Sequence, residues 1–298
     1  AEEVRGALMA RVRQGARPPE ALADLPPLIH EARLIKSEGE LALLRHAGAI
    51  SARAHRRAMC AARPGLAEYH LQAELEHEFR WQGGSGPAYA SIVGGGANAC
   101  VLHYIENRAP LRDGDLVLID AGAEFDLYAG DITRTFPVNG RFSEPQRALY
   151  ELVLRVQEQA VAAVRPGVTL AALHDGVVRG LTEGLIGLGL LEGEVQARID
   201  DESYRRFYLH STSHWLGLDV HDVGAYRQGG EPRALKPGMV LTVEPGLYVP
   251  ADDDIPEAFR GIGIRIEDDV VVTADGHEVL TAGVPKAVEE IEALMVKK

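Results

Sequence analysis

Two short apolar runs that each lie beside a carboxylate stand out in the hydrophobic pattern of the chain. The run VLI that ends at Asp120 is typical of a buried strand, and ITRTF after Asp131 predicts a returning strand beyond a polar turn. We therefore expect Asp120 and Asp131 to meet across a hairpin. A single Asp here is more typical of a turn, but two acids at the buried end of a sheet repel unless a cation lies between them. The pair is interpreted as half of a metal site.

The same pattern occurs a second time in the chain. GDLVLIDAG at 114–122 matches GMVLTVEPG at 238–246 without a gap, so that Asp120 corresponds to Glu244. AGDITRTF follows the first copy as GIRIEDDVVV follows the second, and Glu267 corresponds to Asp131. A third echo, ARPGLAEYHLQAEL against VRPGVTLAALHDGV, places a Pro-Gly break before a helix in each half. This repeat implies two related halves whose four carboxylates converge.

Helical periodicity and capping signals predict the remaining elements. Ser37 with Glu40 forms a capping box, as does Ser143 with Gln146. We expect Gly94 to Gly96 to form a hairpin turn between flanking strands, and 251–257 to be a solvated loop. The predicted helices lie at about 2–16, 37–62, 67–81, 143–165 and 170–190.

Composition bounds the class of protein. With 298 residues and 46% hydrophobic content the chain can bury a large core, and one duplicated domain fits. The net charge of −13 argues against nucleic acid or an anionic membrane as a partner. Cys60 and Cys100 are too few for a disulfide framework, which favours a reducing compartment. The first twenty residues are unlike a signal peptide and no run of 18 apolar residues occurs, so the cytoplasm is the expected location.

Eleven histidines must be sorted before a metal site is assigned. We expect seven to have no partner in a site, because they lie in helical or terminal stretches: His30, His46, His55, His70, His77, His174 and His277. The residues alone leave open which of the other four, His103, His210, His214 and His221, binds metal. Four carboxylates and one imidazole suit two divalent ions, and the oxygen-rich set favours Mn over Zn, Co or Fe.

The motifs together resemble a known family. GDLVLIDAG with AGDITRTFPVNG, HSTSHWLGLDVHDVG, GMVLTVEPGLY and RGIGIRIEDDVVV closely resemble the bacterial aminopeptidase P group of the metallopeptidases that also include prolidase and methionine aminopeptidase. The likeness covers roughly 30–295. It implies an α/β (α+β) pita-bread fold, in which two pseudo-symmetric halves share a curved, mostly antiparallel sheet covered by helices. We expect the catalytic domain at 37–298, with halves at about 37–160 and 161–298.

The family usually carries an N-terminal domain before its catalytic domain. The resemblance therefore implies that 1–36 is a linker helix and connector left from such a domain. Peptide-length preference and the formation of a homo-oligomer stay open for this reason.

The resemblance also implies a ligand set for two metal ions. Asp131 and Glu267 correspond to the bridging carboxylates, Asp120 to a ligand of one ion, and His214 and Glu244 to ligands of the other. Two such ions can activate a shared water and polarise a scissile carbonyl.

The implied activity is hydrolysis of the bond between an N-terminal residue and a following proline, so that peptides with proline at position 2 are the substrates. Glu244 corresponds to the proton shuttle, and His103 and His221 to histidines that steady the substrate carbonyl and the intermediate. His210 would help to form the proline pocket. Tyr248 and Arg265 match positions that orient ligands, with plain structural support as the alternative.

Two other functions share these motifs. Prolidase uses the same ligand set but cleaves only Xaa-Pro dipeptides, whereas methionine aminopeptidase fits HYIEN and SHWLGLDVHD less well. A pita-bread domain can also serve as a metal-free binding module, but the five ligand types present here argue against it.

Ser211 departs from the resemblance, because Gly or another small residue is expected beside His210. We hypothesise that its hydroxymethyl group narrows the proline pocket. The variant Ser211→Gly should then change kcat/KM for a proline substrate, and equal values for the two proteins would discard the hypothesis.

Overall fold

Two three-stranded antiparallel sheets contain the repeated motifs. The computed structural model describes residues 2–21 and 23–296; residues 1 and 22 of the predicted linker, and 297–298 of the predicted catalytic domain, lie outside the described residues. One sheet has the strand order β2-β3-β6 and the other β13-β12-β9. These strands are β2 (Ile92–Gly95), β3 (Leu116–Asp120), β6 (Thr133–Pro137), β9 (Val240–Val243), β12 (Asp268–Val272) and β13 (His277–Val279).

Shorter strands complete the β-structure of the described residues. β1 pairs with β4 and β4 with β5, while β10 pairs with β11 and β7 with β8, in every case antiparallel. Their bounds are β1 (Gly86–Pro87), β4 (Ala123–Phe125), β5 (Tyr128–Ala129), β7 (Arg227–Gln228), β8 (Glu231–Pro232), β10 (Gly246–Tyr248) and β11 (Gly263–Arg265).

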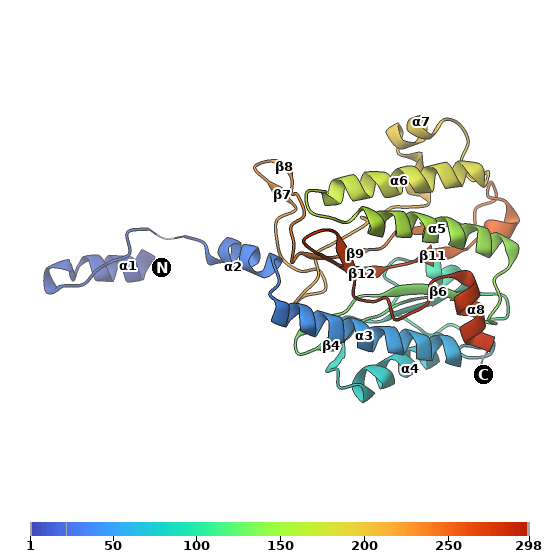
Figure 1. Ribbon diagram of the computed structural model, residues 1–298, viewed down its shortest axis with the longest axis horizontal. Helices are drawn as coiled ribbons and strands as arrows, with labels where there is room; N and C mark the ends of the chain where they lie inside the picture. The colour runs from blue at the N-terminus through green and yellow to red at the C-terminus, as the bar shows by residue number, and fades with distance from the viewer. Residues whose placement is uncertain (1, 22, 297–298) are drawn as a thin grey trace.

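Helices cover the strands from two sides (Figure 1). The pair α3 and α4 packs on one side, and the pair α5 and α6 on the other. The α-helices are α1 (Glu2–Met9), α2 (Leu25–Leu34), α3 (Glu38–Ala61), α4 (Glu68–Trp81), α5 (Glu144–Ala163), α6 (Leu170–Gly187), α7 (Val195–Asp200) and α8 (Val288–Val296). Their apolar faces and the inner strands form one core that includes Leu71, Phe79, Leu149 and Leu181. The fold is the pita-bread fold expected from the resemblance.

The four central helices confirm the periodicity argument within a few residues. The capping box of α3 is formed, because the Ser37 N–H donates to Glu40 Oε2 (2.7 Å) and the Glu40 N–H to Ser37 Oγ (3.4 Å). The first predicted helix is shorter than expected. α1 ends at Met9 and a short 3₁₀ turn follows at Val12–Gln14.

The predicted hairpin between Asp120 and Asp131 is right in its pairing and wrong in its connection. β3 pairs directly with β6, with Asp120 opposite Thr133. The chain between them does not simply turn, because it leaves the sheet to form β4 and β5 beside β1. This excursion brings Asp131 back to the same end of the sheet as Asp120.

The glycine run at 94–96 was also assigned wrongly as a hairpin turn. Gly94 and Gly95 lie inside β2 and pair with Leu118 and Val117 of β3. Gly96 then begins a 3₁₀ helix. Glycine at 94 lets the 3₁₀ helix pack closely on β2, since a Cβ on Gly94 would lie 2.9 Å from the carbonyl carbon of Asn98.

The two halves are joined by hydrogen bonds along one seam. The Glu267 N–H donates to the Thr133 carbonyl (3.1 Å), and Thr135 Oγ1 donates to the Arg265 carbonyl (3.0 Å). The Arg134 guanidinium donates to the Glu267 carbonyl (2.6 Å) and to Asp268 Oδ1 (2.7 Å). The carboxylates at the inner strand ends are therefore held on a rigid support.

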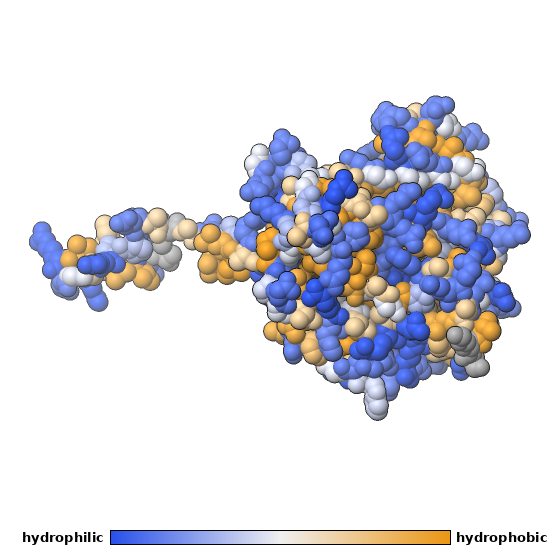
Figure 2. Space-filling model, viewed as in Figure 1, coloured by the Kyte–Doolittle hydropathy of each residue, from blue (hydrophilic) through white to orange (hydrophobic). Residues whose placement is uncertain are grey.

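The segment before α3 is the most exposed part of the described chain. α1 buries none of its residues, and in Figure 1 it lies apart from the strands. Figure 2 shows an apolar patch over α2, where Leu25 and Leu28 are exposed, whereas Leu34 belongs to the core. Within residues 2–21 and 23–296, no helix combines the length and apolar character that crossing a bilayer requires.

Candidate metal centre

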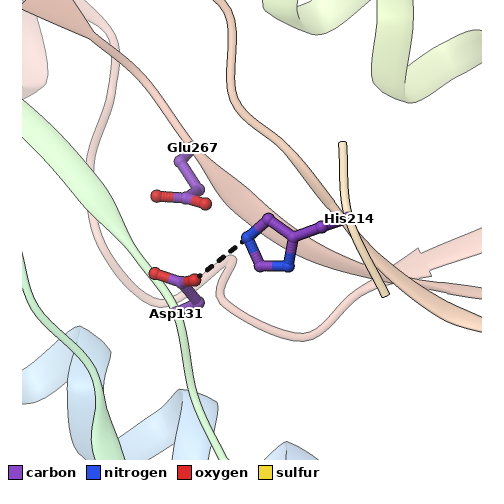
Figure 3. Close-up of side chains that lie close together, drawn as sticks. All are labelled: Asp131, His214 and Glu267. Carbon is purple, nitrogen blue, oxygen red and sulfur yellow. Dashed lines mark ion pairs between the residues drawn. The ribbon is translucent and has the colours of Figure 1, made fainter. Parts of the chain in front are cut away.

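Three side chains with metal-ligating atoms gather where the two sheets meet (Figure 3). The carboxylates of Asp131 and Glu267 and the imidazole of His214 each offer an atom, and these atoms lie within 4.8 Å of one another. His214 Nε2 is 3.5 Å from Asp131 Oδ2. The cluster contains one residue from each copy of the repeated motif and one, His214, from the irregular segment that separates the two copies in the sequence.

Hydrogen bonds from neighbouring residues fix each of these three residues in place. Thr133 Oγ1 donates to Glu267 Oε2 (2.6 Å), and the Asp131 N–H donates to Asp269 Oδ2 (3.0 Å). His214 Nδ1 lies 3.0 Å from the Trp215 carbonyl, which only accepts, so that Nδ1 carries a proton and Nε2 is the ring atom that faces the acids and could bind a metal.

Glu244 and Asp120 enter the same site from the two repeated strands. Glu244 follows β9, and its Oε1 lies 3.4 Å from His214 Nε2 and accepts from Thr242 Oγ1 at 3.1 Å. Asp120 ends β3, and its Oδ2 accepts from Arg265 Nη2 at 2.6 Å. The structure thus brings all five predicted ligands to one place, with Asp120 held by the guanidinium.

The carboxylates in this site repel one another, and the nearby positive charges do not fully compensate them. Burial raises the pKa of Asp131, and burial together with the charges of Asp131 and Glu244 raises the pKa of Glu267 well above its usual range. Burial raises the pKa of Glu244 to about 7. Burial and the charge of Asp131 also raise the pKa of Asp269, whose Oδ1 has no hydrogen-bond partner among the described residues. Such a set of buried oxygen ligands with one imidazole fits divalent cations.

A tyrosine that sequence reasoning missed lies between two of the ligands. The Tyr89 hydroxyl is 2.6 Å from Asp120 Oδ1 and 2.5 Å from Asp131 Oδ1. Its single proton is donated to one carboxylate at a time, which keeps the two side chains at a fixed separation. No motif or spacing marked this residue, because it lies in the irregular stretch before β2.

Tyr89→Phe should lower the affinity for Mn about tenfold, because it removes a donor that orients two ligands. Isothermal titration of metal into the stripped protein measures this. Tyr150→Phe is the matched control, since the Tyr150 hydroxyl donates to the Lys286 carbonyl (2.8 Å) instead. Equal affinity in wild type and Tyr89→Phe would contradict the orienting role.

The remaining predicted residues surround the same cavity of about 1240 Å³. His103, His210 and His221 line it together with the five ligands and Arg265. The His221 ring lies 4.3 Å from the His214 ring between centroids. Tyr248 lies behind the lining and contacts His210.

A chain of hydrogen bonds sets the state of His210. Arg265 Nη1 donates to the Tyr248 hydroxyl (2.8 Å), which therefore donates its own proton to His210 Nε2 (2.8 Å). His210 Nδ1 is 2.9 Å from the Ser211 carbonyl and carries the ring proton. Burial and the Arg265 charge lower the pKa of His210 to about 3. His210 thus lines the cavity as a neutral imidazole.

One expectation about the histidines was wrong. His174, expected to have no site partner, lines the cavity, and its Nδ1 is 2.9 Å from Thr212 Oγ1. The stretch at 215–220 contains no strand, and Trp215 makes an isolated bridge to Leu241. This stretch is instead the irregular segment that carries His214 and His221.

In metal-free protein, stability should fall as pH rises from 7 to 9. Burial alone lowers the pKa of His214, but Asp131 and Glu244 raise it to about 9, while that of Glu244 is about 7. In the unfolded chain His214 titrates near 6.5, so that between pH 7 and 9 only the folded state still holds its proton. The proton that folded Glu244 holds beyond its unfolded value near 4.5 is lost at the start of this window. The free energy of unfolding therefore decreases by about 1.4 kcal/mol per pH unit for each extra proton.

Urea unfolding in the presence of a chelator, at intervals across this window, measures the slope. Added Mn should flatten it, because metal replaces the protons. A free energy of unfolding that rises with pH in the metal-free protein would contradict the assignment.

Four carboxylates and one imidazole lie between two similar antiparallel sheets. This arrangement is typical of a metal-dependent hydrolase with the pita-bread fold. Residues 42–274 match metallopeptidase family M24, and the chain belongs to this family.

Three similar proteins are named as aminopeptidases. The chain is 53% identical to the Xaa-Pro aminopeptidase of Escherichia coli (strain K12), covering 99% of this chain and 68% of that protein. The structure of the Pseudomonas aeruginosa aminopeptidase PepP matches with a TM-score of 0.95 and 56% identity, covering 99% of this chain and 67% of that one. A variant of Escherichia coli aminopeptidase P in complex with substrate matches with a TM-score of 0.92 and 54% identity, covering 98% and 66%. The chain thus spans about two thirds of the length of these relatives.

Proposed function

We propose that this chain is a Xaa-Pro aminopeptidase, which hydrolyses the bond between an N-terminal residue and a penultimate proline. The observation that carries the proposal is 53% identity to an enzyme of that name over nearly the whole chain. It is supported by the gathering of residues from both halves around one cavity, which is large enough for a short peptide.

The proposed metal cofactor is a pair of divalent ions, with Mn favoured by the oxygen-rich ligand set and Zn, Co or Fe as alternatives. Asp131 and Glu267 would hold both ions, Asp120 one, and His214 and Glu244 the other. When bound, these ions supply the Lewis acidity that activates water and polarises the scissile carbonyl.

Side chains of the cavity would transfer the proton, stabilise the substrate carbonyl and bind the proline. Glu244, whose Oε1 lies 3.4 Å from His214 Nε2 and which lines the cavity, is suited to take a proton from the attacking water and to deliver it to the leaving proline nitrogen. His103 and His221 line the cavity and would donate to the substrate carbonyl as charge develops on it. The neutral ring of His210 would pack on the proline.

The test is release of the N-terminal residue from Xaa-Pro-Xaa and Xaa-Pro peptides by metal-stripped protein, with and without added Mn. Metal-dependent cleavage of the longer peptide would support the proposal. Cleavage of the dipeptide alone would reassign the chain to prolidase. Absence of turnover despite bound metal would favour a binding module.

We also propose a location and a domain organisation for the enzyme. A cytoplasmic location agrees with Cys60 and Cys100, which are free thiols. We further propose the division into 1–36 and a catalytic domain at 37–298, with halves at about 37–160 and 161–298. The matching β3/β6 and β9/β12 pairs support the two halves. A homo-oligomer stays a prediction that sedimentation velocity would test.

A further inference from the structure

Glu68 is a buried carboxylate whose side-chain hydrogen bonds all go to one loop. It is the first residue of α4, and its exposure is 0%. Burial of a carboxylate is costly unless strong donors replace water, and the partners that the described chain gives it are neutral donors. Oε1 accepts from Gly95 N (2.8 Å) and Asn98 Nδ2 (2.9 Å), and Oε2 accepts from Tyr104 Oη (2.8 Å) and Ala109 N (2.8 Å).

These donors lie on both sides of His103. Gly95 and Asn98 precede it, and Tyr104 and Ala109 follow it, so that the loop at 95–109 closes around the carboxylate. A Cβ on Gly95 would lie 2.5 Å from Leu111 Cδ2, so that a larger residue there would have to displace the buried Leu111 side chain.

The part of the loop that carries His103 has one apolar and one polar anchor. Leu102 and Tyr104 pack on an apolar cluster that includes Leu118 and Tyr248. His103 itself is exposed where it lines the cavity, and the hydroxyl of its neighbour Tyr104 donates to Glu68. Glu68 therefore supplies the polar anchor beside His103.

We propose that Glu68 is a positioning residue that holds His103 over the metal centre. The inference rests on the proposed function, in which His103 contacts the substrate carbonyl. Glu68 itself does not line the cavity, and it acts by restricting where the imidazole lies. A displacement of about 1 Å in such a group is enough to slow catalysis strongly.

The test is a double-mutant cycle between Glu68 and His103 in the metal-loaded protein. Glu68→Ala should lower kcat/KM about 10-fold to 100-fold, mainly through kcat, with the Mn content unchanged. Glu68→Gln should lose less, because one oxygen acceptor remains in place. In a His103→Ala background the further loss from Glu68→Ala should shrink to about twofold or less. Equal losses in the two backgrounds would overturn the proposal.

A stability control separates positioning from general damage. Leu75→Ala leaves a cavity in the core face of the same helix, where Leu75 is fully buried, and should lower the unfolding midpoint while keeping kcat/KM within about twofold. A loss of activity in Leu75→Ala as large as that in Glu68→Ala would overturn the proposal.

Hydrogen exchange supplies a readout that is independent of activity. Glu68→Ala should speed exchange of the Gly95 and Ala109 amides and of the segment at 101–106, while the β3 amides stay protected. If the wild type cleaves neither peptide, the proposed function fails and this measurement still decides the role of Glu68. Faster loop exchange would support it, and unchanged protection would overturn it.

Discussion

Replacement of Glu244 by alanine should reduce kcat for Xaa-Pro-Xaa peptides by about 10³-fold to 10⁴-fold. The variant loses a carboxylate that lies 3.4 Å from His214 and that is placed to move the proton in both halves of the reaction. Steady-state release of the N-terminal residue at saturating Mn measures the effect.

A control variant tests whether this effect is specific to Glu244. Glu278→Ala removes a half-exposed carboxylate that pairs with Arg45 at 2.7 Å, outside the cavity, and should leave kcat within about twofold. A Glu244→Ala variant that retains a tenth or more of the wild-type kcat would contradict the assignment of the proton shuttle.

Asp131→Asn should abolish tight metal binding and yet stabilise the metal-free protein at pH 10, where His214, whose pKa is about 9, no longer carries the charge that Asp131 attracts. Asp131 contributes negative charge that raises the pKa of Glu244, Glu267 and Asp269. Its neutralisation relieves that repulsion, but the loss of a carboxylate that is expected to bridge two ions should weaken Mn binding by at least about 100-fold. Isothermal titration and urea unfolding with a chelator measure the two effects.

The neighbouring Asp268 is a matched contrast. It is equally buried, but burial is outweighed by Arg134 and Lys286, whose charges lower its pKa. Asp268→Asn should therefore destabilise the fold by about 3–5 kcal/mol, since it leaves a buried guanidinium with less compensation. If Asp131→Asn destabilises the metal-free protein by a similar amount, the acid cluster is not repulsive and the reasoning for a cation between its members fails.

The acid cluster could be predicted because each acid lies in a short sequence motif and the motif occurs twice. Asp120 and Glu244 each end a short buried strand, and the alignment of the two strands is visible in the letters themselves. When each half buries the apolar residues of its strand, the ends of the two strands are brought together at the interface of the halves. The predicted pairing of β3 with β6 was right for the same reason.

The path of the chain between these strands could not be predicted in this way. The β4 and β5 excursion and the pairing of Gly94 and Gly95 with β3 depend on partners far along the chain. Glycine permits several backbone conformations, so that the run at 94–96 suits either a turn or a tightly packed strand. Only the close approach of neighbouring backbone decides between them.

Tyr89 and Glu68 show a second limit of sequence reasoning. Tyr89 contacts acids that are 31 and 42 residues away, and Glu68 collects donors from 27 to 41 residues away. Neither residue has a periodicity or spacing that distinguishes it from an ordinary surface Tyr or a first-turn Glu. His174 was missed for the same reason, since its helical context concealed its contact with Thr212.

The sequence by itself determined the repeat, the central helices and the four carboxylates of the proposed metal centre, since those follow from hydrophobic period, capping chemistry and recurring motifs. The tertiary structure alone decided which neutral donors fix the ligands and the histidine loop, and which acids are left without a compensating charge. Those properties arise from burial and from contacts between distant segments, because the energy of a carboxylate depends on the donors and charges that folding places around it.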